Sequence, residues 1–243
     1  MSTFAIKLLA LFLMVIDHIG YYFDGAPVWF GWLGRACYPL FLFCMVWGYH
    51  YTRSRKRYLL RLYGMSLFMT AFGCLIDRFL PTEGGYGNHN IFLPLFLVGV
   101  LISAVELFQQ DKKKGGLLLG GIFAVQVLYG ILPFHQFLSG DILTGIIPNL
   151  YINEYGFEFV ALGVLMYFLK ENKAYFTAMY ILFCINQFSM AVVEGSGDAQ
   201  WLMIAALPIM LRYDHQKGWG MKYFFYGFYP AHTFLLFLLA NLV

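Results

Sequence analysis

Charged residues are scarce in this sequence: Asp, Glu, Lys and Arg make up only 12% of its 243 residues, whereas hydrophobic residues make up 60%. The mean hydropathy is correspondingly high, at +0.67. So few polar side chains could not cover the surface of a water-soluble domain, and the composition therefore indicates an integral membrane protein. The net charge of +3 is too small to favour nucleic acid as a partner.

Recognisable metal and nucleotide motifs are absent as well. The chain contains no His-x3-His, no Cys-x2-Cys and no carboxylate cluster, so the sequence gives little support for a metal site. The glycines of "KKKGGLLLGGIF" (112–123) resemble the small residues that pack membrane helices more than a phosphate-binding loop. The four cysteines all lie in apolar segments, where we expect buried thiols and no disulfide framework.

What the sequence does contain is a series of long apolar runs. A membrane-spanning helix needs about 20 mostly apolar residues, so these runs predict an all-α polytopic protein. We expect residues 1–243 to form a single integral membrane domain whose first span is retained, because it has no cleavage site. The nine predicted spans are 4–23, 33–51, 59–79, 91–109, 115–133, 153–169, 174–191, 200–212 and 221–241. Segment 134–152 is interrupted by Ser139-Gly140-Asp141 and by Pro148-Asn149, and we interpret it as a re-entrant or interfacial element.

The loops between these spans differ in charge, which predicts their side of the membrane. Basic residues gather in loops 52–57, 111–114, 170–173 and 212–222. The alternate loops carry acidic residues: Asp24, Asp77, Glu83, Asp141, Glu154, Glu194 and Asp198. Cytoplasmic loops of membrane proteins carry the excess of Lys and Arg. The pattern therefore predicts a cytoplasmic N-terminus and, with nine spans, an extracytoplasmic C-terminus.

Within the first span, the stretch "LLALFLMVIDHIGYYF" (8–23) places Asp17 and His18 inside the membrane. A charged side chain in hydrocarbon costs about 3 kcal/mol on insertion scales, so such residues indicate a functional site. A structural alternative stays open, in which Asp17 pairs with Arg35 and His18 bonds to a neighbouring carbonyl.

Lys7 and His18 are eleven residues apart and therefore lie on one face of a helix. The separation along the axis is about 16 Å, whereas Asp17 is rotated by about 100° from His18. A cation at the cytoplasmic boundary with an imidazole deeper on the same face suits a long substrate with an anionic head, such as an acyl-coenzyme A. The alternative for Lys7 is that it only extends to the membrane surface.

Two further polar residues lie near predicted spans. His232 follows Pro230 in the last span, near mid-membrane, where it is either a site residue or a hydrogen-bonded histidine beside a kink. Arg35 follows Gly34, which allows close helix approach, and a cation there can hold Asp17 or stabilise a developing oxyanion.

Three sequence blocks resemble the TraX family, named for a conjugation protein associated with N-terminal acetylation of F-type pilin. They are "IKLLALFLMVIDHIGYYF", "GRACYPLFLFCMVWGYHYTRSRKRYLLRLYG" and "KYFFYGFYPAH". The family in turn is distantly similar to the acyltransferase-3 group, whose first helix carries Arg/Lys-x10-His. Lys7 and His18 have that spacing, so the resemblance implies that His18 is the catalytic base and that Lys7 belongs to the donor path.

We therefore predict an acyltransferase of the bacterial cytoplasmic membrane. It would transfer an acetyl group from cytoplasmic acetyl-CoA to an amine or hydroxyl of an unidentified peptide, glycan or lipid acceptor, without a metal cofactor. The expected catalytic residues are His18, Asp17, Arg35 and His232. The residues expected to bind the phosphates of coenzyme A are Lys7, Arg53, Arg55, Lys56, Arg57 and Arg61. Membrane lipid is an expected partner, and a homo-oligomer stays open.

Other interpretations remain. The basic cluster at 53–61 is equally explained by membrane topology alone. Asp17, His18 and His232 could form the proton relay of a proton-coupled transporter or flippase, although we find no inverted repeat of the kind that typifies secondary transporters. A non-catalytic membrane scaffold is the third possibility.

Overall fold

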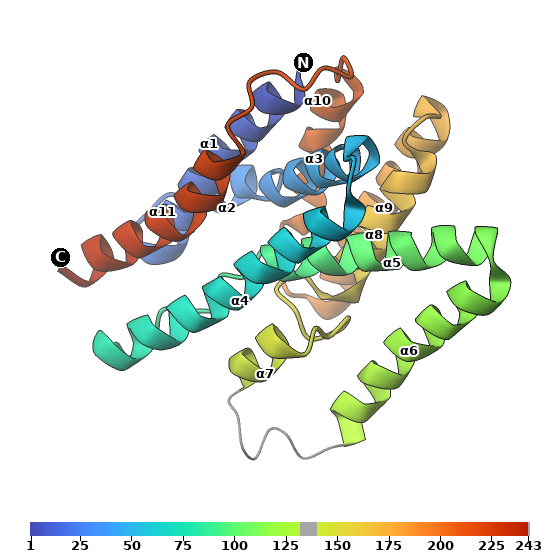
Figure 1. The fold of residues 1–243 in the computed structure, drawn as a ribbon. Coiled ribbons are helices and arrows are strands. Elements are labelled where there is room, and N and C mark those ends of the chain that lie inside the picture. The colour runs from blue at the N-terminus through green and yellow to red at the C-terminus, as the bar shows by residue number, and fades with distance from the viewer. Residues whose placement is uncertain (132–139, 243) are drawn as a thin grey trace. The chain divides into compact units, whose positions relative to one another are not determined.

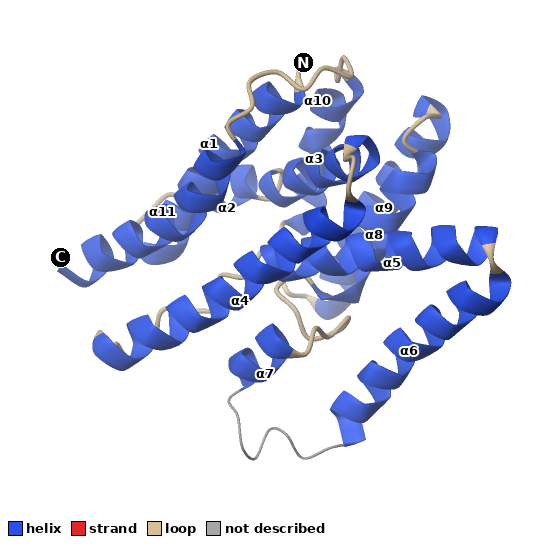
Figure 2. Ribbon diagram, in the orientation of Figure 1, coloured by secondary structure: helices blue, strands red, loops and turns tan. Residues whose placement is uncertain are grey.

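Residues 1–131 and 140–242 are described by a computed structural model, and they contain helices and no strand (Figure 2). The predicted all-α class is therefore confirmed. Within these residues, seven helical segments are long and apolar enough to cross a membrane. They are α1 (Thr3–Tyr22), α2 (Trp29–Gly34) with α3 (Cys37–Tyr51), α4 (Arg55–Phe79), α5 (Phe92–Gln110), α6 (Lys112–Ile131), α9 (Lys173–Glu194) and α11 (Lys222–Leu242).

Two of the predicted spans are apolar helices of less than full membrane length. They are α8 (Gly156–Leu169) and the segment Gln200–Leu211, in which a 3₁₀-helix, η2 (Gln200–Ala206), continues into α10 (Leu207–Leu211). The count of nine spans thus stays a prediction. Of the segment expected to be re-entrant, residues 134–139 lie outside the described residues, and the rest forms the short helix α7 (Gly140–Ile146) followed by irregular chain.

The helices α1, α4 and α9 begin at polar residues that satisfy their first backbone N–H groups. The side chain of Ser2 accepts a hydrogen bond from the Ala5 N–H, and Ser54 caps α4 in the same way. The Asn172 side chain accepts from two N–H groups of α9, which ends at Gly195 with a φ of 61°. These are common N-cap and C-cap residues, and they separate the apolar runs from the loops.

The chain divides into two compact units, Met1–Gly48 with Phe168–Val243 and Tyr49–Tyr167. That the whole chain forms one membrane domain stays a prediction.

In the first unit, α1 and α11 pack along each other and run in the same direction (Figure 1). Aromatic pairs connect the two helices in matching order: Phe4 with Phe225, His18 with His232, and Tyr22 with Phe237. The loop before α11 lies at the beginning of α1, where the Thr3 N–H donates to the Gln216 carbonyl at 2.8 Å. α9 packs on η2, and the Tyr180 hydroxyl donates to the Met203 carbonyl at 2.8 Å.

In the second unit, α5 packs against both α4 and α6, and α7 packs on α4. The approach of α7 depends on Gly145, because a Cβ there would stand 2.1 Å from the Thr70 hydroxyl oxygen. A buried amide ties the start of α5 to α4: the Asn90 side chain donates to the Ser66 hydroxyl at 3.1 Å and to the Thr70 hydroxyl at 3.2 Å.

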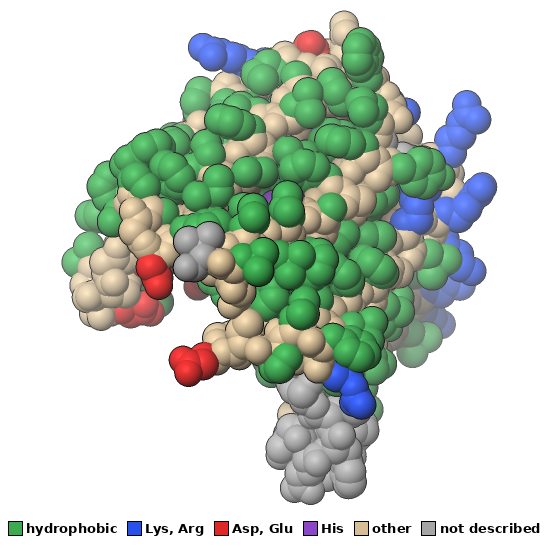
Figure 3. All heavy atoms as spheres, turned by 90° about the vertical axis from the view of Figure 1, so that its left-hand side faces the viewer, with side chains coloured by type: hydrophobic (Ala, Val, Ile, Leu, Met, Phe, Trp, Pro, Cys, Tyr) green, Lys and Arg blue, Asp and Glu red, His purple; other side chains and the backbone are tan. Residues whose placement is uncertain are grey.

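Many large apolar side chains lie on the surface. Phe12 of α1 is 61% exposed, Phe123 of α6 69% and Leu182 of α9 66%. Hydrophobic side chains also cover much of the face drawn in Figure 3. Such surfaces are unfavourable in water and suit lipid, so the structure agrees with the composition in indicating an integral membrane protein.

Candidate active site

The two histidines predicted to lie in the membrane contact each other. His18 Nδ1 on α1 is 2.8 Å from His232 Nε2 on α11, although the residues are 214 positions apart in the sequence. Their ring planes differ by only 5°. The sequence predicted both residues as site residues but not their pairing, for which it carries no local signal.

The ring of His232 is fixed by its own helix. Its Nδ1 lies 2.9 Å from the Phe228 carbonyl oxygen, and its ring is nearly parallel to that of Phe228, with centroids 5.0 Å apart. His232 is buried, at 7% exposure. The helix therefore presents Nε2 of His232 to α1.

Aromatic rings surround the histidine pair. Tyr22 and Tyr229 meet the His18 ring edge-on, with centroids 6.5 and 6.4 Å away. Aromatic faces exclude water and lower the local dielectric, which strengthens hydrogen bonds between the imidazoles.

Asp17 lies against the backbone of Gly34. A Cβ at Gly34 would stand 2.0 Å from Asp17 Oδ1, so the absence of a side chain at Gly34 is what admits the carboxylate. The close helix approach expected at this glycine is thus observed between α1 and α2. The structure places Asp17 beside α2, while its neighbour His18 faces α11.

Arg35 follows α2 and binds a different carboxylate from the one proposed as the structural alternative. Its Nη2 is 3.4 Å from Asp198 Oδ1, and its Nη1 donates to Gln200 Oε1 at 3.2 Å. Among the described residues, no ion pair within 4.0 Å joins Arg35 to Asp17. The acidic residues at the end of α9 and in the loop after it, Glu194 and Asp198, were the available sequence signal for this pair.

Lys7 contacts the same helix as His18. Its Nζ lies 5.5 Å from the ring centroid of Phe225 on α11, a cation–π distance. Lys7 and His18 therefore both face α11, one near the start of α1 and one near its end. That Lys7 belongs to the path of the acyl donor stays a prediction.

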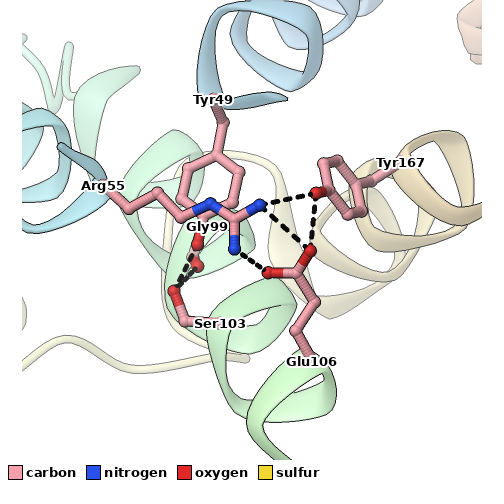
Figure 4. A network of polar contacts seen from close by, with 6 residues as sticks. All are labelled: Tyr49, Arg55, Gly99, Ser103, Glu106 and Tyr167. Atoms are coloured by element: carbon pink, nitrogen blue, oxygen red, sulfur yellow. Dashed lines mark hydrogen bonds and ion pairs between the residues drawn. The ribbon is translucent and has the colours of Figure 1, made fainter. Parts of the chain in front are cut away.

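The basic cluster at 53–61 belongs to the second unit, and one of its members is held by protein partners (Figure 4). Both terminal nitrogens of Arg55 contact the Glu106 carboxylate, and Nη2 also donates to the Tyr167 hydroxyl at 3.2 Å. Tyr167 in turn donates to Glu106 Oε1 at 2.7 Å. The guanidinium lies 5.0 Å from the centroid of the Tyr49 ring, whose hydroxyl is 2.6 Å from the Ser103 oxygen. Arg55 thus ties the start of α4 to the end of α5.

The other members of the cluster are exposed: Arg53, Lys56, Arg57 and Arg61. The Arg61 guanidinium lies 5.8 Å from the Tyr58 ring centroid. Within the described ranges no three His, Cys, Asp or Glu side chains come together as a metal site would require. The structure therefore places the predicted residues in separate groups: the histidine pair, Asp17 at Gly34, Arg35 at Asp198, and the basic cluster.

Comparisons with known proteins place this sequence in a family. No solved structure matches the chain. The probable fimbrial assembly protein FimC, serogroup H1, of Dichelobacter nodosus is 25% identical over 249 residues, which cover 97% of this chain and 94% of that protein. The model of the TraX protein family matches residues 2–240. Since that match covers nearly the whole sequence, the chain belongs to the TraX family.

Proposed function

We propose that this TraX-family protein is a membrane acetyltransferase that moves an acetyl group from cytoplasmic acetyl-CoA to an amine or hydroxyl. The observation that carries the proposal is the 2.8 Å contact between His18 and His232, because a hydrogen-bonded imidazole is a suitable general base. The family is associated with pilin acetylation, and the similar protein of D. nodosus is named for fimbrial assembly. A fimbrial subunit is therefore the first acceptor to test, ahead of a glycan or a lipid.

In the proposed reaction His18 removes a proton from the acceptor N–H or O–H. The freed electron pair attacks the thioester carbonyl carbon, the carbon–sulfur bond breaks, and coenzyme A leaves as a thiolate. His18 returns the proton to that thiolate, so the products are the acetylated acceptor and free coenzyme A. General acid–base catalysis of this kind contributes about 10²- to 10⁴-fold in rate. We also propose that Arg35 stabilises the oxyanion that forms at the thioester carbonyl, although its guanidinium pairs with Asp198.

The donor would approach from the beginning of α1, where the basic loop 212–222 also lies. We propose that Lys7 of the first unit contacts the phosphates of coenzyme A. That Arg53, Lys56, Arg57 and Arg61 of the second unit bind such phosphates is a separate proposal. Arg55 is the exception among the predicted residues, because its terminal nitrogens are engaged by Glu106 and Tyr167.

The proposed topology has nine spans in the bacterial cytoplasmic membrane, with the N-terminus inside and the C-terminus outside. The parallel packing of α1 and α11 supports an odd number of crossings, because both helices begin at the same end of their unit. The seven long segments already make an odd number of crossings. The two short helices must therefore either both cross the membrane or both fail to cross it.

Contacts of the segment 200–212 favour crossing. At one end Gln200 bonds to Arg35, the residue after Gly34, whose backbone contacts Asp17 in the second half of α1. At the other end the Tyr213 hydroxyl accepts from the Thr3 hydroxyl at 3.1 Å, at the beginning of α1. Together with Tyr213, the segment therefore extends from the beginning of α1 to about the level of Asp17. With an odd number of crossings, α8 counts as a span as well.

Acetyl transfer is tested with radiolabelled acetyl-CoA, membranes that carry the protein, and a fimbrial subunit from the same source. We expect His18→Ala to lower transfer about 10²- to 10⁴-fold. The matched control is His50→Gln in the last turn of α3, which removes an imidazole outside the pair and should leave transfer unchanged. Full transfer by the His18→Ala variant would refute the proposal.

The same histidine contact supports a second candidate, a proton relay for transport, because hydrogen-bonded imidazoles can pass protons. Purified protein in proteoliposomes separates the two. Proton flux that depends on His18, in the absence of any acetyl transfer, would favour the relay.

A further inference from the structure

We infer that His232 is a positioning residue that holds His18 in one tautomer, with the proton on Nδ1. Nε2 of His18 is then the atom that takes the proton of the acceptor. The catalytic consequence of this inference rests on the proposed acetyl transfer. The tautomer itself follows from a chain of three groups: His18, His232 and the Phe228 carbonyl.

The direction of the hydrogen bonds follows from the far end of this chain. A carbonyl oxygen only accepts, so the 2.9 Å contact to Phe228 requires a proton on His232 Nδ1. A neutral imidazole has a single N–H, and Nε2 of His232 is therefore an acceptor. The 2.8 Å contact then requires His18 to donate from Nδ1. A neutral His18 in this state carries its lone pair on Nε2.

The geometry of the two rings suits a linear hydrogen bond. The ring planes differ by only 5°, and two of their nitrogens are 2.8 Å apart. Rings stacked face to face would be separated by about 3.5 Å. The centroids of these two rings are 4.9 Å apart, so the rings are parallel but displaced sideways, and the N–H of one can reach the lone pair of the other.

Several features of α11 prevent His232 from turning over. Its ring lies parallel to that of Phe228 within 13°, in a buried position. The next residue, Thr233, donates to the Tyr229 carbonyl at 3.1 Å, beside Pro230 inside the same helix. A flipped His232 would lose its bonds to both Phe228 and His18 and would leave buried polar groups without those partners, which is unfavourable.

During the reaction this arrangement would also stabilise the charge that forms. When Nε2 of His18 takes the proton, His18 becomes an imidazolium whose Nδ1–H still bonds to His232. The Phe228 carbonyl polarises His232 through its Nδ1–H and so makes its Nε2 a better acceptor. A buried acceptor at Nδ1 orients the base and stabilises the imidazolium, the part that a carboxylate plays in serine hydrolases. Asp17 does not orient His18 in this way, since its carboxylate lies against Gly34.

Nitrogen-15 NMR of the purified full-length protein tests the tautomer directly. The protein, labelled at its histidines, is placed in lipid nanodiscs, and the His18 signals are assigned from their loss in His18→Gln. We expect a one-bond N–H coupling at Nδ1 of His18 and none at Nε2. A proton on Nε2 of neutral His18 in the unaltered protein would overturn the inference.

Two substitutions at His232 separate positioning from mere packing. His232→Leu removes the acceptor, so the His18 proton should distribute over both nitrogens, and kcat should fall about 10- to 100-fold without a change in KM for acetyl-CoA. His232→Gln supplies an amide oxygen as acceptor and an amide N–H as donor, and should restore the Nδ1 tautomer and most of kcat. Equal losses in both variants with an unchanged tautomer would contradict the inference.

The tautomer seen by NMR is independent of the proposed function, whereas the changes in kcat depend on it. The Nδ1 tautomer without acetyl transfer to any acceptor would refute the acetyltransferase and leave the positioning intact. Acetyl transfer that depends on His18, together with the other tautomer, would refute the positioning alone.

Discussion

The carboxylate of Asp17 lies against the backbone of Gly34, where even a methyl group would stand 2.0 Å from its Oδ1. Two residues that sequence analysis treated as separate features, an intramembrane acid and a glycine before Arg35, thus form a single contact between α1 and α2. Because of this contact, Asp17 packs against α2, whereas the adjacent residue His18 contacts α11.

We predict that Gly34→Ala separates α1 from α2 and destabilises the protein. Overpacking of this kind costs about 1–3 kcal/mol, because the carboxylate or the helix must move. Thermal unfolding of the purified protein in detergent measures the loss. Gly31→Ala on the same short helix is the control, since nothing lies within 4 Å of a Cβ there and its stability should be unaffected. Equal melting temperatures for both variants would argue against a tight contact at Gly34.

We predict that Arg55 and Arg57 differ in function although they are two residues apart. Arg55→Gln breaks the contacts to Glu106 and Tyr167 and should lower the free energy of unfolding by about 1–2 kcal/mol, as charged hydrogen bonds at a partly exposed site do. Arg57→Gln should leave stability unchanged and weaken coenzyme A binding. Denaturation and calorimetry on both variants measure the two effects. The opposite assignment would show that Arg55 binds the donor.

We predict that Lys7→Gln weakens coenzyme A binding and reduces its dependence on salt. An exposed contact between charges is screened over about 8 Å at physiological ionic strength, so its loss removes part of that dependence. Isothermal titration calorimetry at two salt concentrations measures both quantities. His18→Ala should keep the affinity, because the imidazole is assigned to proton transfer. If the unaltered protein binds neither coenzyme A nor acetyl-CoA at millimolar ligand, the acetyltransferase proposal should be abandoned.

We predict that single cysteines report the nine-span topology. Lys113→Cys and Glu171→Cys should react with a membrane-impermeant thiol reagent only when the cytoplasmic side is exposed. Glu83→Cys and Ser196→Cys should react from the outside of intact cells. Labelling of all four in permeabilised cells is the control for reactivity. Reaction of Glu171→Cys from the outside would mean that α8 does not cross the membrane.

Local sequence determined the class of protein and the position of most helices. Hydropathy over about 20 residues is a property of near neighbours, and it decides whether a segment is stable in lipid. Helical periodicity is local too, and it placed Lys7 and His18 on one face, which in the structure meets α11. The family blocks likewise lie within continuous stretches of chain, and a match over residues 2–240 confirmed them.

The partners of the polar residues were decided only by the tertiary structure. His18 bonds to His232, 214 positions away, and Arg35 pairs with Asp198 where the sequence offered Asp17 as the nearer candidate. Arg55, expected to bind phosphate, is held by Glu106. Each choice depends on which helices pack together and at what height along their axes. That outcome is set by side-chain packing over the whole helix surface, so no local pattern of charge or hydropathy encodes it.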